Sequence, residues 1–130
     1  MNIFAECKKE DAKKAVEHAC QVISTKDRSA ALAELLKYRY CDSNYVWIQD
    51  EDVNMVQHPI KRRLRGSLKE KTTKNGKKLF VEFDKMAKSK PEGGWVDYVW
   101  PRVGGEVAEA KISFIKNCGK GLIVGSGVWK

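Results

Sequence analysis

Residues 93–101 have the sequence GGWVDYVWP, which places two tryptophans and a tyrosine in strand-like alternation after a pair of glycines. Alternation bounded by a glycine turn and a proline predicts a β-strand. Side chains two positions apart share one face of a strand, so Tyr98 and Trp100 point the same way, as do Tyr45 and Trp47 in residues 45–49. The four rings fit either the wall of a small-ligand pocket or ordinary core packing.

The remaining periodic segments predict helices and further strands. Apolar residues at three- and four-residue steps predict a helix over residues 3–24, and a second helix from the capping segment 24–27 to about Tyr38. A shorter helix is expected over residues 79–87.

A period of two predicts a five-stranded antiparallel sheet. Its strands are expected at residues 45–49, 54–57, 95–100, 110–116 and 122–129. Helices followed by an antiparallel meander predict an α+β fold. We expect one domain over residues 1–130, with a helical N-terminal part (1–40) and a sheet part (44–130).

Composition is that of a globular protein: 130 residues, 42% hydrophobic and 32% charged. No apolar run is long enough to cross a bilayer, so we do not expect a membrane-spanning protein. The N-terminal residues 1–14 are charged, unlike a signal peptide. An export signal that was removed and one that never existed both remain open.

The formal net charge is +8, and the excess is concentrated in residues 61–65 (KRRLR) and in five further lysines up to Lys78. No zinc-finger spacing, helix-turn-helix or RNA-reading motif accompanies these charges, so we expect no nucleic-acid partner. A solvated surface and the attraction of small anions toward a cleft are the two readings that remain. A basic nucleic-acid- or anion-binding protein is the alternative function.

The four cysteines, Cys7, Cys20, Cys41 and Cys118, include no close-spaced pair of the kind that ligates zinc, so we expect no metal site. Cys7 and Cys20 are expected on one helical stretch, too far apart along its axis to bond each other. A disulfide involving Cys20 or Cys41 and buried free thiols explain the count equally well.

Enzymatic motifs are missing from the sequence. The chain has two histidines, His18 and His58, and no nucleophile elbow, phosphate loop or zinc-protease helix. We therefore expect no catalysis, no catalytic residue and no cofactor. A small hydrolase-like site that pairs Cys118 or Cys41 with His58 is a further alternative.

Six sequence fragments, in order along the chain, support a family resemblance. They are YVWI (45–48), MVQHP (55–59, followed by Leu64 and Gly66), NGKKLF (75–80), GWVDYVWP (94–101), KIS (111–113) and VGSGVW (124–129). The chain resembles a single Cache domain of the second type, the extracytoplasmic sensor module of bacterial chemoreceptors and sensor kinases, and especially the free-standing secreted variety.

The resemblance implies a PAS-like five-stranded antiparallel sheet with a long N-terminal helix and a second helix packed on it. It also implies a sensor domain for signal transduction or chemotaxis that binds a small organic acid such as acetate, propionate, lactate or pyruvate. The implied ligand-binding residues are Tyr45, Trp47, His58, Tyr98, Trp100 and Lys111. A carboxylate removed from water needs charge-assisted partners, which Lys111 and a protonated or donating His58 supply, while the aromatic rings enclose the alkyl part.

Two departures from the family pattern matter. Val53 stands at the usual glycine of the first hairpin turn, so we expect Asn54 to take the positive φ there. The basic segment 61–65 replaces a frequent proline and favours a more acidic ligand, such as a dicarboxylate.

Location and assembly follow from the same resemblance. We expect a periplasmic or secreted protein, and the end at Lys130 without a signalling segment favours a complete secreted protein over an excised receptor domain. A wide alanine-rich stripe on residues 12–23 predicts a weak homodimer through the N-terminal helix.

Overall fold

The computed structural model of the protein describes residues 7–73 and 75–130. In chain order the elements are α1 (Lys9–Thr25), α2 (Arg28–Lys37), β1 (Trp47–Asp50), β2 (Asn54–Gln57), β3 (Gly66–Ser67), α3 (Leu79–Ser89), β4 (Gly94–Pro101), β5 (Ala108–Asn117) and β6 (Leu122–Trp129). The predicted α+β fold is confirmed.

The strands form one sheet in the order β3-β2-β1-β6-β5-β4, and every neighbouring pair is antiparallel. The predicted count of five strands was too low, because β3 adds a sixth. This strand has two residues, which pair with Asn54 and Met55. Two residues are too few to produce a detectable alternation, so the sequence carries no signal for them.

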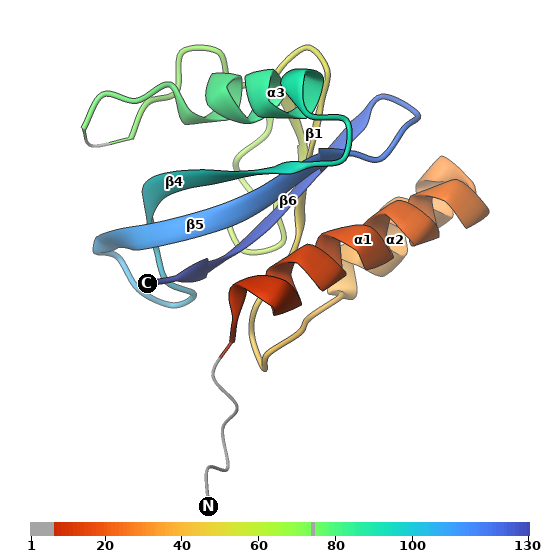
Figure 1. Ribbon diagram of the computed structural model, residues 1–130, viewed down its shortest axis with the longest axis horizontal. Helices are drawn as coiled ribbons and strands as arrows, with labels where there is room; N and C mark the ends of the chain where they lie inside the picture. Colours follow the sequence, from red (N-terminus) through yellow and green to blue (C-terminus); the bar gives the residue numbers. More distant parts are fainter. Residues whose placement is uncertain (1–6, 74) are drawn as a thin grey trace, which may run out of the picture.

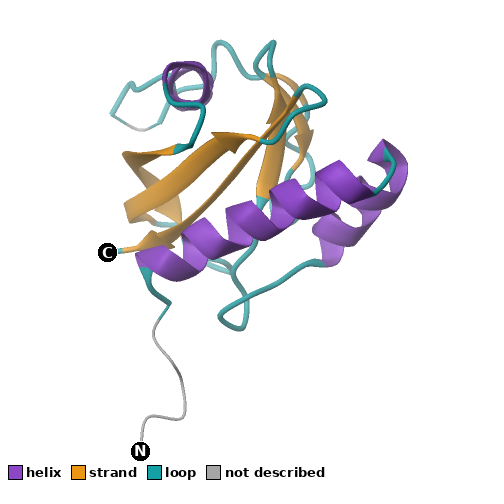
Figure 2. Ribbon diagram, turned by 45° about the vertical axis from the view of Figure 1, so that its right-hand side comes forward, coloured by secondary structure: helices purple, strands orange, loops and turns teal. Residues whose placement is uncertain are grey.

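The sheet lies between two helical layers. Helices α1 and α2 cover one face and α3 covers the other, as Figures 1 and 2 show from two directions. Strand alternation divides the side chains between the layers: Val46 and Ile48 pack with α1 and α2, whereas Tyr45 and Trp47 pack under α3. The space beneath α3 is therefore built from alternate residues of several strands.

Helix α1 begins at Lys9, later than the predicted residue 3, and residues 3–6 of the prediction lie outside the described residues. The backbone N–H of Lys8 donates to the carboxylate of Asp11 at 2.9 Å, which is the reciprocal contact of a capping box and fixes the helix start. Cys7 therefore precedes the helix, and the expectation that it shares a helical stretch with Cys20 was wrong.

The alanine-rich stripe of α1 is covered by the chain's own sheet. Its residues are at most 1% exposed: Ala12, Ala15, Val16, Ala19 and Ile23. Small side chains let the helix lie close to β5 and β6. Packing within one chain thus explains the stripe. Self-association remains a prediction, but the stripe no longer supports it.

The turn between β1 and β2 has a geometry that differs from the expected one. Val53, not Asn54, has the positive φ, at 59°. The Asp50 carboxylate accepts the backbone N–H groups of Asp52 and Asn54, each at 2.9 Å, and Asn54 already pairs with β3. Although burial raises the pKa of Asp50, these hydrogen bonds hold it below its ordinary value. The strain at a β-branched residue is offset by burial of its side chain in the core under α3.

All four cysteines form disulfides, which settles the question that the sequence left open. Cys7 is bonded to Cys41, and this bridge ties the segment before α1 to the loop after α2. Cys20 is bonded to Cys118, and this bridge ties α1 to the turn between β5 and β6. The second bridge fastens α1 to the sheet, whereas the first links the two ends of the helical pair.

Candidate ligand-binding site

One small cavity between the sheet and α3 collects all six side chains that the sequence singled out. Tyr45, Trp47, His58, Tyr98, Trp100 and Lys111 line it together with Leu79, Phe80 and Phe83 of α3. The void that remains for the centre of a water molecule is about 10 Å³, the space of roughly one water. The side chains therefore nearly fill the cavity in this structure.

Strand geometry explains why these residues meet. Tyr98 pairs directly with Lys111 across β4 and β5, so both side chains emerge on the same face. Trp47 reaches the same space from β1, on the far side of β6, because its β6 partner is Gly125. Any side chain at Gly125 would collide with the Trp47 indole. Gly125 thus lets the indole lie across the sheet.

Lys111 is the most unusual residue of the cavity, since its side chain is 1% exposed. Its ammonium nitrogen donates to the Tyr45 hydroxyl at 3.2 Å and lies 4.2 to 5.8 Å from the ring centres of Trp129, Tyr45, Trp47 and Tyr98. Within residues 7–73 and 75–130 no carboxylate forms an ion pair with it. Burial lowers the pKa of Lys111 from 10.5 to about 7. Lys111 is therefore unlike most lysines in strands, whose ammonium groups are solvated.

His58 is also buried, with 3% of its surface exposed. Its Nδ1 accepts the backbone N–H of Lys61 at 2.9 Å and of Ile60 at 3.3 Å. A neutral imidazole with an accepting Nδ1 carries its hydrogen on Nε2. Burial, with the nearby charges of Lys111 and Lys61, lowers the pKa of His58 to about 3. His58 was expected to be either protonated or a neutral hydrogen-bond donor. Near neutral pH it is neutral and can donate from Nε2.

The hydroxyl of Tyr98 hydrogen-bonds the hydroxyl of Ser113 at 2.7 Å. Burial raises the pKa of both Tyr98 and Tyr45 above the ordinary value, so both phenols stay neutral at physiological pH. Lys111 is consequently the one group lining the cavity whose pKa lies near neutrality, among the residues described.

Sequence reasoning missed the α3 side chains that cover the cavity and one further aromatic ring beside Lys111. Phe83 packs against Trp47 with ring centres 5.1 Å apart and against Tyr98 at 5.2 Å. The apolar spacing of residues 79–87 indicated a buried helix face but not which sheet face it would cover. Trp129 pairs with Lys111 across β5 and β6 and is the aromatic ring nearest to its ammonium group. Register between strands would have been needed to find it.

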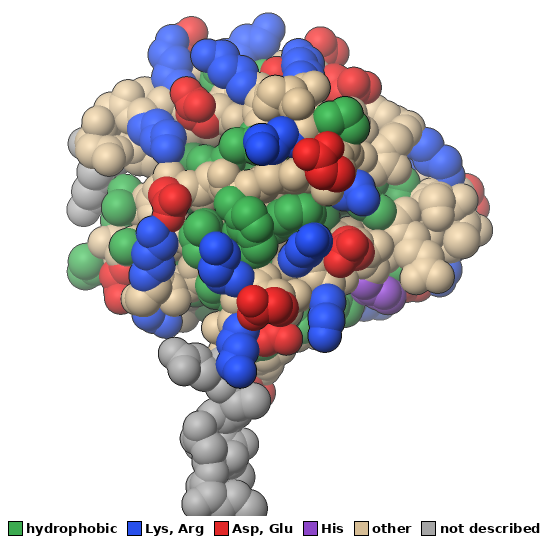
Figure 3. Space-filling view, viewed as in Figure 1, with side chains coloured by type: hydrophobic (Ala, Val, Ile, Leu, Met, Phe, Trp, Pro, Cys, Tyr) green, Lys and Arg blue, Asp and Glu red, His purple; other side chains and the backbone are tan. Residues whose placement is uncertain are grey.

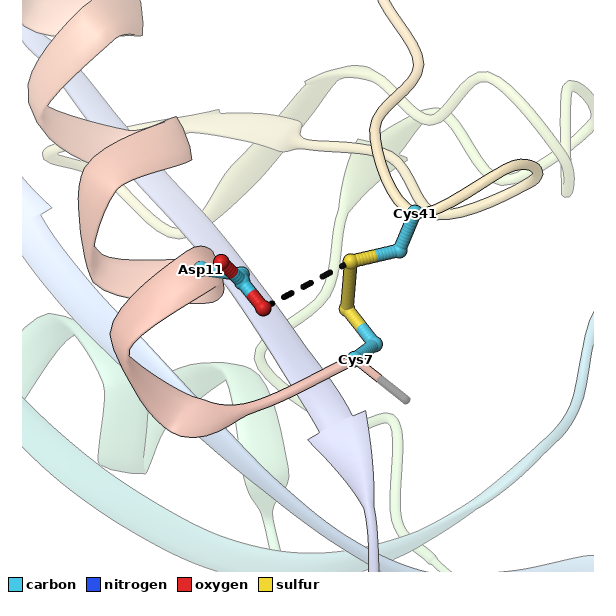
Figure 4. A group of neighbouring side chains, drawn as sticks. All are labelled: Cys7, Asp11 and Cys41. Carbon is cyan, nitrogen blue, oxygen red and sulfur yellow. Dashed lines mark hydrogen bonds between the residues drawn. A yellow bond between two sulfur atoms is a disulfide. The ribbon is translucent and has the colours of Figure 1, made fainter. Parts of the chain in front are cut away.

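In the described part of the chain, potential metal ligands gather at Cys7, Asp11 and Cys41. Figure 4 shows the two sulfurs joined in the disulfide, with the Asp11 carboxylate 3.8 Å from Cys41 Sγ. Disulfide sulfurs are not thiolates, which are the form that binds metal, and they carry no hydrogen to donate. The three residues are therefore better described as the N-terminal cap of α1, made by Asp11, next to the Cys7–Cys41 disulfide than as a metal site. For the same reason Cys41 and Cys118 offer no nucleophile to His58.

No helix among the described residues has the length and apolar character needed to cross a membrane. Lysine and arginine side chains are interspersed with acidic ones over the face seen in Figure 3, where α3 and α1 lie at opposite ends. This face has no continuous basic surface of the kind that tracks a nucleic-acid backbone.

Residues 5–130 match the sequence profile of a family described as the Cache domain. Over 115 residues the chain is 31% identical to the methyl-accepting chemotaxis protein McpP of Pseudomonas putida. The match covers 84% of this chain and 21% of McpP, so the chain spans about a fifth of the length of this relative.

Three solved structures are similar to this one. A periplasmic sensor domain of a chemotaxis protein is 37% identical, with a TM-score of 0.77 over 92% of this chain and 88% of that one. A Cache chemosensory domain, described in connection with carboxylic acid recognition, is 29% identical, with a TM-score of 0.84 over 93% and 92%. A methyl-accepting chemotaxis protein from Vibrio parahaemolyticus shares the fold at 18% identity, with a TM-score of 0.82 over 93% and 87%.

Proposed function

The chain belongs to the Cache domain family, and from that premise we propose that it is the extracytoplasmic ligand-binding part of a sensor protein, with a small organic carboxylate as its ligand. The similarity to a periplasmic sensor domain and to a domain described for carboxylic acid recognition supports this assignment. Two disulfides support an oxidising compartment, such as the periplasm or the exterior of the cell.

The observation that carries the proposal is the buried Lys111 without an acidic partner among the described residues. An ammonium group removed from water is costly unless an anion compensates it. A ligand carboxylate in the cavity supplies that anion and forms a charge-assisted hydrogen bond with Lys111. The Nε2–H of His58 and the Tyr45 hydroxyl are the neighbouring polar groups available to the second carboxylate oxygen.

The aromatic walls support a ligand of few heavy atoms. Trp47, Trp100 and Phe83 line the space and offer carbon surface to a short alkyl chain. Because the present void holds roughly one water, even acetate or propionate requires the rings to move apart. Acetate, propionate, lactate and pyruvate are the acids we propose.

Calorimetric titration of the purified protein with these four acids tests the proposal, after a thermal-shift screen that detects ligands of the folded state. Replacing Lys111 with Ala is expected to weaken binding by about 1.5–3 kcal/mol, the scale of a hydrogen bond to a charged group. Lys116→Ala is the matched control, because it removes a lysine from the same strand, outside the cavity.

Unchanged affinity in Lys111→Ala would remove Lys111 from the site. Equal weakening by Lys116→Ala would mean that the general positive charge of the protein, not a contact in the cavity, attracts the acid. Failure of all four acids to bind would contradict the proposed ligand class.

A further inference from the structure

A second, open groove lies on the outer side of the cavity wall. Its lining comes from the segment after β2, the segment before α3, and the end of β4: residues 60–64, 71–72, Phe80, Trp100 and Pro101. Water can reach about 740 Å³ within it, so unlike the cavity it has room for a ligand without rearrangement.

Among the residues that the structure describes, the groove is lined by four cations, Lys61, Arg62, Arg63 and Lys71, and by no acidic side chain. All four are exposed, and in the part of the chain that the structure describes none of them forms an ion pair. Arg62 donates from Nε to the carbonyl of Pro59 at 3.2 Å, which anchors the guanidinium at its inner end. Clustered like charges raise the local concentration of small anions.

Phe80 and Trp100 belong to both spaces, because each lines the cavity as well as the groove. Their ring centres are 6.0 Å apart in an edge-to-face arrangement, so one layer of aromatic rings separates Lys111's cavity from the basic groove. His58 is a further link between the cavity and the basic groove. Its imidazole lines the cavity while its Nδ1 holds the backbone N–H of Lys61 at the start of the basic segment.

We propose that the basic groove is a second anion subsite and that the preferred ligand is a short dicarboxylate, with one carboxylate at Lys111 and the other beyond Trp100 at Arg62 and Arg63. This inference rests on the proposed function, which supplies the first carboxylate. Arginine suits the outer position because its planar guanidinium binds a carboxylate through two parallel hydrogen bonds while remaining in water. The two subsites are neighbours because Phe80 and Trp100 line both of them. A ligand that moves these two rings apart can occupy both subsites at once.

The test compares acids of equal chain length that differ in the second carboxylate: propionate with malonate, and butyrate with succinate. Calorimetry on the wild-type protein is expected to give at least one dicarboxylate an affinity about tenfold above its monocarboxylate partner, the scale of one charge-assisted contact. The double variant Arg62→Gln/Arg63→Gln is expected to lose that preference and to bind propionate within about twofold of wild type. Binding of propionate also reports that the variant is folded.

A matched variant, Lys14→Gln/Lys37→Gln, removes the same two charges from α1 and α2 on the opposite face of the sheet and is expected to keep the dicarboxylate preference. Dicarboxylates that bind no more tightly than their partners would overturn the subsite while leaving the proposed function intact. Equal loss of propionate and succinate in the arginine variant would also overturn it, since long-range attraction would then be the cause. If neither kind of acid binds the wild type, the proposed function itself fails.

Discussion

Binding of the carboxylate is expected to weaken as the pH rises above 7, because Lys111 must be charged to hold it. The groups that face Lys111 do not titrate between pH 6 and 9. The pKa of His58 lies at about 3, and the pKa values of Tyr45 and Tyr98 are raised above those of ordinary phenols. Carboxylic acids titrate near pH 4 and are ionised throughout this window. The pH dependence of binding therefore isolates one lysine.

The magnitude follows from the pKa of about 7 that burial gives Lys111 in the unoccupied cavity. A carboxylate at hydrogen-bond distance favours the charged form, so binding raises the pKa of Lys111 in the complex. The apparent dissociation constant then rises with pH above 7, by up to about tenfold for each pH unit as long as Lys111 stays protonated in the complex. At pH 8 the protein takes up close to one proton for each ligand that it binds.

Isothermal titration calorimetry at fixed pH, in buffers of different ionisation enthalpy, measures that proton uptake directly. Repeating the titration from pH 6 to 9 gives the slope of affinity against pH. Lys116→Ala serves as the control, because Lys116 lies outside the cavity and its loss leaves the slope unchanged. A constant affinity from pH 6 to 9, with no proton uptake at pH 8, would refute the assignment of Lys111 as the partner of the carboxylate.

The stability of the unliganded protein is expected to increase over the same pH range in which ligand binding weakens. The pKa of Lys111 is about 7 in the folded protein and 10.5 when solvated, so between these values the unfolded chain binds more protons. The free energy of unfolding of the unliganded protein therefore gains from Lys111 as the pH rises from 7 toward 10. Lys111→Met removes the buried charge and is expected to melt at a higher temperature than wild type at pH 6 while binding the acid more weakly.

Three further predictions concern the bridges, nucleic acid and self-association. Replacing Cys20 and Cys118 by serine opens a cross-link across 98 residues, and denaturant unfolding should show that the free energy of unfolding falls by about 4–5 kcal/mol. Opening the 34-residue link of Cys7 and Cys41 should cost less, and the reverse order would contradict this prediction. Binding to duplex DNA should be weak and disappear near physiological salt, and a salt-resistant, sequence-selective gel shift would show the opposite. Self-association through the N-terminal helix, which the buried stripe of α1 no longer supports, is tested by sedimentation, and a strict monomer at high concentration would end that hypothesis.

The strands and the pocket residues were predictable because they follow from a short-range rule. Alternation alone puts Tyr45 with Trp47, and Tyr98 with Trp100, on one face each. The family resemblance then joined the two pairs with His58 and Lys111. All six side chains line one cavity. Their role in ligand binding stays a prediction.

What the sequence did not reveal depends on distant contacts. A lysine in a strand is ordinarily exposed, and the burial of Lys111 becomes visible only when α3 and the neighbouring strands surround it. Spacing cannot decide how four cysteines pair, because three pairings are possible. The positive φ of Val53 likewise accompanies the pairing of Asn54 with β3, which is a contact between segments distant in the sequence.

Strand β5 gives the cavity a direct mechanical connection to the N-terminal helix. Lys111 points into the cavity, and the next residue, Ile112, points to the other face of the sheet, where it packs with Ala12 of α1. A ligand that pulls on the Lys111 ammonium therefore acts one residue away from a contact with α1. Because the Cys20–Cys118 bridge also ties α1 to the turn at the end of β5, the helix is held to this strand at two places. Displacement of β5 on ligand binding must then either move α1 or deform a packed and cross-linked interface, and close packing makes the first of these the less costly response.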